Sequence, residues 1–155
     1  MTPSKSAGLL MFRRAADGEV EVLLAHPGGP FWARKDAGAW TIPKGEHDDV
    51  EEALAAAKRE FVEETGFAAI EPFIVLGSLK QPSGKWIVIW AFESDCDPGA
   101  LVSNTFEMEW PPRSAHQSSF LEVDRAGWFG LDEAALKLSK GQVPFLARLA
   151  DALRA

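Results

Sequence analysis

Three glutamates, Glu60, Glu63 and Glu64, have the type and spacing of a metal-binding cluster. They lie in segment 50–65, which is rich in Ala, Glu, Lys and Arg, contains no Gly or Pro, and is followed by Gly66. This composition predicts a helix that stops at the glycine. At about 100° per residue, the three carboxylates fall within an arc of about 100° on one face of that helix.

Such an acidic arc could bind a hard divalent cation. Like charges three or four residues apart cost about 0.2–0.5 kcal/mol per pair on an isolated helix, so a compact acidic face favours a neutralising cation. The candidate ligands are carboxylate oxygens, and the chain has one cysteine and only scattered histidines, which favours Mg²⁺ or Mn²⁺ over Zn²⁺. The alternative is a solvated acidic face whose charges pair locally with Lys58 and Arg59.

The spacing of these glutamates belongs to a longer pattern over residues 45–67, which reads GEHDDVEEALAAAKREFVEETGF. This stretch resembles the Nudix box at every specified position. The matching residues are Gly45, Glu51, Arg59, Glu60, Phe61, Glu63, Glu64, Gly66 and Phe67. The resemblance implies one Nudix hydrolase domain over residues 1–155, with an α/β fold: an α/β/α sandwich around a mixed, largely antiparallel sheet.

The same resemblance implies a Mg²⁺ site and a phosphoanhydride hydrolase. Its metal ligands would be the side chains of three box glutamates and one backbone carbonyl, from Glu60, Glu63, Glu64 and Gly45. Clustered divalent ions neutralise the charge on phosphoryl oxygens and activate water, which is the chemistry that this reaction needs.

The remaining box residues receive supporting roles from the resemblance. Glu51 and Arg59 would hold the loop against the helix, with a phosphate contact as the alternative for Arg59, and Gly66 would end the helix. Two residues are candidates for the general base. Glu63 is the first, and Glu122, which precedes a Trp-containing strand, is the second; the alternative for Glu122 is an exposed loop acid.

The residues before and after the box indicate which class of substrate to expect. The lead-in WTIPKG at 40–45 resembles that of Nudix enzymes acting on diadenosine or diphosphoinositol polyphosphates, and it places Lys44 to contact an extra phosphate. The distance of Pro82 from the box resembles ADP-ribose-type enzymes, although Pro-Ser-Gly also suits a hairpin turn. Trp86 could stack on a base in place of tyrosine, which the chain lacks.

The loop at 26–36 offers further substrate contacts. Arg34 and Lys35 could bind phosphate, and Phe31 or Trp32 could stack on a base. The same aromatic side chains could instead fix the loop to the core.

Together these residues predict metal-dependent hydrolysis of a diphosphate bond in a nucleoside diphosphate-linked substrate, foremost a (di)nucleoside polyphosphate. One alternative is an ADP-ribose or nucleotide-sugar pyrophosphatase. An alternative from another class is a non-catalytic Nudix module that binds nucleotide, which the intact box acids disfavour.

The elements that must position these residues follow from periodicity and turn residues. Alternation and apolar runs predict strands before and after the box helix, with a long loop at 27–39 and capping of the box helix by Asp48 or Asp49. The expected strands are 7–14, 19–25, 73–81, 85–93, 105–110 and 127–130, and the expected later helices are 131–139 and 143–154.

The amino-acid composition indicates which binding partners and which cellular compartment to expect. The 155 residues carry a net charge of -7, which disfavours nucleic acid as a partner and leaves a small nucleotide or polyphosphate as the expected one. The chain shows no apolar stretch long enough for a membrane span or a signal peptide. The single cysteine, Cys96, cannot form an internal disulfide, so we expect a cytoplasmic protein. The sequence indicates no oligomeric state.

Overall fold

A six-stranded mixed sheet forms the centre of the computed structural model, which describes residues 5–48 and 52–154. The hydrogen-bonded order is β4-β5-β1-β2-β8, and a short strand, β3, also pairs with β1. The strands are β1 (Lys5–Arg14), β2 (Val20–Pro27), β3 (Lys44–His47), β4 (Ile74–Lys80), β5 (Trp86–Glu93) and β8 (Val123–Gly130). Only the β1–β5 pair is parallel among these pairings. The predicted α/β class with a largely antiparallel sheet is therefore confirmed.

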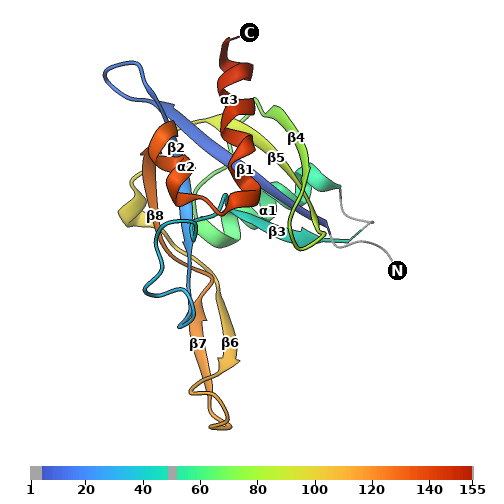
Figure 1. The fold of residues 1–155 in the computed structure, drawn as a ribbon, viewed down its shortest axis with the longest axis vertical. Helices are drawn as coiled ribbons and strands as arrows, with labels where there is room; N and C mark the ends of the chain where they lie inside the picture. The colour runs from blue at the N-terminus through green and yellow to red at the C-terminus, as the bar shows by residue number, and fades with distance from the viewer. Residues whose placement is uncertain (1–4, 49–51, 155) are drawn as a thin grey trace.

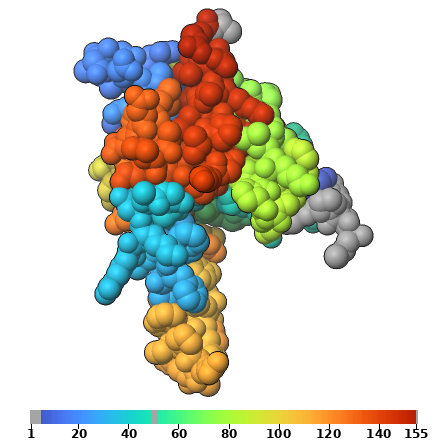
Figure 2. All heavy atoms as spheres, in the orientation of Figure 1, coloured from blue at the N-terminus to red at the C-terminus, as the bar shows by residue number. Residues whose placement is uncertain are grey.

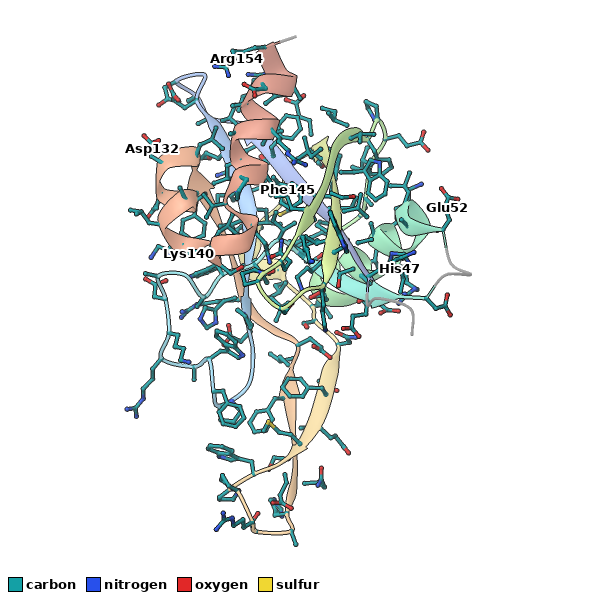
Figure 3. The ribbon with its side chains drawn as sticks, turned by 45° about the vertical axis from the view of Figure 1, so that its right-hand side comes forward. His47, Glu52, Asp132, Lys140, Phe145 and Arg154 are labelled. Atoms are coloured by element: carbon teal, nitrogen blue, oxygen red, sulfur yellow. The ribbon has the colours of Figure 1, made fainter. Side chains whose placement is uncertain are left out.

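Helices cover both faces of the sheet (Figure 1). The box helix α1 (Ala53–Thr65) packs on one face, and α2 (Leu131–Lys137) and α3 (Pro144–Arg154) pack on the other. Alternate residues of β1 supply both cores: Leu9 faces α1, whereas Leu10 faces α3. In Figure 3, Phe145, which is fully buried, lies on the sheet side of α3. This is the sandwich that the sequence predicts.

A two-stranded hairpin projects from the sandwich as an arm (Figures 1 and 2). The arm consists of β6 (Thr105–Glu109) and β7 (Gln117–Leu121), which pair only with each other. The loop 28–39 packs against the arm at two places. The Phe31 ring contacts Trp110, just beyond β6, with the ring centres 5.6 Å apart, and Gly29 lies against Phe106 of β6. The arm is thus a narrow extension held to the body at its root and by this loop.

The structure corrects three expectations about elements. β3 and β7 are not among the expected strands, and β8 begins at Val123 instead of residue 127. These segments are polar or rich in small residues, and they become strands because a partner strand pairs with them, β1 with β3 and β2 with β8. Two short 3-10 turns, Pro98–Ala100 and Lys140–Gln142, complete the chain.

The start of the box helix also differs from the expectation. The capping residue of α1 is Glu52, whose side chain makes no cap hydrogen bond, so the predicted cap at Asp48 or Asp49 is wrong. Asp48 lies before the helix, and Asp49 is outside the described residues, as is Glu51. No helix of the described residues is long and apolar enough to span a membrane.

Candidate active site

The end of α1 is tied to the root of the arm by backbone hydrogen bonds. Gly66, at a φ of 75°, ends the helix by donating its N–H to the Val62 carbonyl. Beyond it, the N–H of Val102 donates to the Thr65 carbonyl at 3.0 Å, and the N–H of Asn104 donates to the Glu63 carbonyl at 2.9 Å. These bonds satisfy carbonyls that a helix end leaves without partners. They also fix the segment before β6 beside the box glutamates.

An acidic hollow of about 360 Å³ lies between β3, α1 and the root of the arm. In Figure 3, His47 and Glu52 lie on the same side of the molecule as α1, away from Asp132 on α2. The residues that line the acidic hollow come from four segments far apart in the sequence: Lys44, Gly45, Glu46, Glu60, Glu64, Asn104 and Glu122.

Gly45 permits the closest approach within this hollow. A Cβ atom at Gly45 would lie 2.0 Å from Cδ and 2.2 Å from Oε2 of Glu60, so only glycine leaves space for that carboxylate. Gly45 is held in place by strand pairing with Ala7 of β1. The two box residues therefore form a cradle in which the strand backbone meets a carboxylate.

Among the described residues of the box, Glu64 has the most strongly altered pKa. Its Oε2 accepts a hydrogen bond from the Lys44 backbone N–H at 3.1 Å. Burial raises the pKa of Glu64 to about 8, with a further contribution from the negative charge of Glu60. Burial and the charge of Glu60 also raise the pKa of Glu122. The hollow thus holds carboxylates whose mutual repulsion a cation would relieve.

Arg59 pairs with two of the box glutamates. Its Nη1 lies 2.8 Å from Oε1 of Glu60 and 3.4 Å from Oε2 of Glu63. The Glu63 side chain is 43% exposed, compared with 17% for Glu60, and Glu63 does not line the acidic hollow. The structure therefore brings together Glu60, Glu64 and Glu122, with Glu63 pointing toward Arg59.

The donor set of the hollow fits Mg²⁺ or Mn²⁺. Within residues 5–48 and 52–154, no group of three His, Cys, Asp or Glu side chains has the arrangement of a closed metal site as the side chains stand. The available donors are carboxylate and carbonyl oxygens, which hard divalent cations prefer. The cradle at Gly45 and the raised pKa of Glu64 are both what a site adapted to a cation would show. Glu60, Glu64 and Gly45 are accordingly the best-placed candidate ligands.

Comparison with protein families decides the assignment. The NUDIX domain model matches residues 3–149, nearly the whole chain. The chain belongs to the NUDIX family. No curated protein sequence matches the chain significantly.

Several solved structures share this fold. A Caenorhabditis elegans Ap4A hydrolase binary complex superposes with a TM-score of 0.62 at 23% identity, covering 97% of this chain and 98% of that one. The NUDIX domain of Shewanella oneidensis NrtR complexed with ADP ribose gives 0.69 at 16% identity, covering 99% and 90%. A mutT/nudix family protein from Listeria innocua gives 0.61 at 25% identity, covering 99% and 96%. Membership of the NUDIX family, together with these structural neighbours, supports the conclusion that this protein is a hydrolase.

The other predicted substrate residues of this Nudix domain lie outside the acidic hollow. Arg34 is exposed on loop 28–39, and the Nζ of Lys35 lies 5.0 Å from the centre of the Trp32 ring. Trp86 opens β5 and is 46% exposed. Sequence reasoning missed Asn104 and Glu46 as lining residues, and no local pattern marks either. Only the pairing of strands brings them to the hollow.

The raised pKa of Glu64 predicts a pH-dependent stability of the Nudix domain in EDTA. The folded protein keeps this proton up to about pH 8, whereas the unfolded chain releases it near the ordinary value of 4.5. The folded state binds more protons between these values, so stability should fall as pH rises from 4.5 to 8 and level off above 8. Thermal unfolding across this range should show the fall in the wild type and a smaller one in Glu64→Gln. An equal slope in both proteins would contradict this origin.

Proposed function

We propose that this Nudix hydrolase cleaves a diphosphate bond in a (di)nucleoside polyphosphate, with Mg²⁺ or Mn²⁺ held by Glu60, Glu64 and the Gly45 carbonyl. When bound, the divalent cation neutralises phosphoryl oxygens and lowers the pKa of a water nucleophile. Glu63 lies about one helical turn from Glu60 on α1, so it is the further candidate for metal ligand and general base. We also propose that the protein is cytoplasmic and that its residues form a single domain, as the sequence predicts.

The position of Lys44 is the observation that favours a polyphosphate as the substrate. Lys44 lines the acidic hollow and also a neighbouring hollow of about 420 Å³, which contains Pro82, Lys85 and Trp86. A polyphosphate could extend from the carboxylates past Lys44 toward the half-exposed indole of Trp86. The ammonium groups of Lys44 and Lys85 could bind several phosphates, and the indole of Trp86 could stack on the base of the same nucleotide. The Ap4A hydrolase among the structural neighbours supports this choice.

Glu122 is the general base that this geometry favours. It lines the hollow together with Glu60 and Glu64, and its raised pKa brings it closer to neutral pH, where a base is most effective. Arg59, already beside Glu60 and Glu63, could exchange these partners for a phosphate oxygen. Arg34 and Lys35 remain candidate phosphate contacts through movement of loop 28–39.

ADP-ribose is the second candidate substrate. Pro82, whose distance from the box resembles the ADP-ribose enzymes, lines the same hollow as Trp86. The NrtR domain among the neighbours was crystallised with ADP ribose. A shorter diphosphate would leave Lys44 and Lys85 with fewer phosphates to contact.

A substrate panel tests the proposed function. Purified protein with Mg²⁺ would be incubated with diadenosine tetraphosphate, ADP-ribose, nucleoside triphosphates and 5′-triphosphate RNA, and the products would be identified by mass. Cleavage foremost of the diadenosine compound is the expected result. Preference for ADP-ribose would reject the role of Lys44, and binding without turnover of any compound would favour a non-catalytic module.

Trp86→Ala should raise KM for the preferred nucleotide by about tenfold and leave kcat nearly unchanged. Base stacking on an aromatic side chain is worth about 1–3 kcal/mol, and Trp86 does not line the acidic hollow that holds the carboxylates. Leu136→Ala, which removes an exposed apolar side chain from α2, is the control. Steady-state kinetics would contradict base stacking if Trp86→Ala had a wild-type KM.

A further inference from the structure

Asn104 occupies a fixed position in the wall of the acidic hollow. Its N–H donates to the Glu63 carbonyl at 2.9 Å, and its carbonyl accepts from the Glu122 N–H at 2.9 Å. The arm continues this pairing with Thr105 opposite Leu121. The backbone of Asn104 is therefore tied both to the box helix and to Glu122, which lies between β7 and β8.

The Asn104 side chain is exposed at this wall. Within the part of the chain that the structure describes, its amide makes no hydrogen bond, although the residues around it are rich in acceptors. An asparagine side chain carries two N–H donors and one carbonyl acceptor without net charge. It is therefore a rigidly mounted polar group available to a ligand.

Donors are scarce in this hollow, whereas acceptors are abundant. Glu60, Glu64 and Glu122 supply carboxylate oxygens, and Lys44 is the one cationic side chain among the described lining residues. Phosphate oxygens accept hydrogen bonds and are repelled by carboxylates. An amide N–H can bind such an oxygen without adding negative charge, which neither Asp nor Glu could do at this position.

We infer that the Asn104 amide is a substrate-binding group that donates a hydrogen bond to a diphosphate oxygen in the acidic hollow. This inference rests on the proposed function, because it takes the substrate to carry a diphosphate held above Glu60 and Glu64. Asn104 lines the hollow together with Glu122 and the box glutamates Glu60 and Glu64. Asn104 thus orients the diphosphate between the cation ligands and the general base.

Binding of methylenediphosphonate, a diphosphate analogue whose bridging carbon resists hydrolysis, tests this role without turnover. Isothermal titration in Mg²⁺ would compare wild type, Asn104→Ala and Asn104→Asp, with Gln117→Ala as a control that removes an exposed amide from the far end of β7. Asn104→Ala should bind the analogue about tenfold more weakly, the loss expected for one hydrogen bond to a charged group. Asn104→Asp should bind more weakly still, because its carboxylate repels the analogue.

Two further measurements separate binding from folding and from metal coordination. The thermal midpoint of Asn104→Ala should match that of the wild type, because the three hydrogen bonds of the residue are made by its backbone. Its Mg²⁺ affinity should also be unchanged. Unchanged affinity for the analogue would overturn the inference, as would a parallel loss of Mg²⁺ affinity, which would make the amide a metal ligand, or a wild type that does not bind the analogue.

The two proposals can fail separately. If no compound in the substrate panel is hydrolysed while the analogue binds and Asn104→Ala weakens it, the proposed hydrolysis fails and the role of Asn104 stands. If a diphosphate is hydrolysed while the variant binds the analogue like the wild type, the role of Asn104 fails and the hydrolysis stands.

Discussion

Glu64→Gln should lower kcat/KM with Mg²⁺ by about 10²-fold or more, the scale of removing one group that stabilises charge in a transition state. Glutamine has nearly the same shape and can still accept the hydrogen bond from the Lys44 N–H, so the fold should persist. What it removes is the negative charge that a divalent cation would compensate. Because this carboxyl has a pKa of about 8, its proton must leave before a cation binds it.

Metal titration with the same variant completes this prediction. Mg²⁺ affinity of the wild type should rise with pH up to about 8, whereas Glu64→Gln should bind weakly at every pH. Glu133→Gln removes an exposed carboxylate from the first turn of α2 and is the matched control. A Glu64→Gln protein with wild-type activity would exclude Glu64 from the metal site.

Gly45→Ala should fold and yet lose activity by roughly 10²-fold, because its methyl group displaces the Glu60 carboxylate. The new Cβ would lie 2.0 Å from Cδ of Glu60, a distance that atoms do not tolerate. The atoms it meets belong to a flexible side chain, so Glu60 can rotate away without moving β3. The loss should therefore appear in Mg²⁺ affinity and kcat/KM, with little change in the thermal midpoint.

Gly130→Ala is the control for this substitution, since a Cβ there meets no atom within 4 Å and its φ is -62°. Gly8→Ala gives the opposite contrast. Its Cβ would lie 2.4 Å from the Pro43 carbonyl oxygen, which is backbone, so that variant should lose stability instead of metal affinity. Gly45→Ala behaving like Gly8→Ala would mean that the cradle is structural.

Local sequence patterns were sufficient for the elements that depend on local interactions. The box helix ends at Gly66 because a left-handed residue is needed there, and the β4–β5 hairpin turns at Gly84, which has a φ of 91°. The alternation of Phe106 and Met108 with Glu107 also corresponds to the half-buried and exposed faces of β6. Each of these features is decided by residues close together in the chain.

Features decided by distant partners could not be obtained in this way. β3 is a strand because β1 pairs with it, and Asn104 meets Glu122 because the arm folds back on itself. Helical angles correctly place Glu60, Glu63 and Glu64 on one face, but they do not indicate which part of that face β3 crosses. Gly45 contacts Glu60 and leaves Glu63 exposed. The choice between Glu63 and Glu122 as base depends on that crossing.

Local opening of the arm should affect ligand binding. A two-stranded ribbon is only marginally stable in water, so the arm should open at a lower free-energy cost than the sheet. Its root carries Asn104 and Glu122, and these residues line the hollow together only while the ribbon is closed. A ligand that binds the closed form must, by linkage, make opening more costly. The affinity of the hollow and the local stability of the arm are thus thermodynamically coupled, and a change in the ribbon far from the carboxylates can alter both.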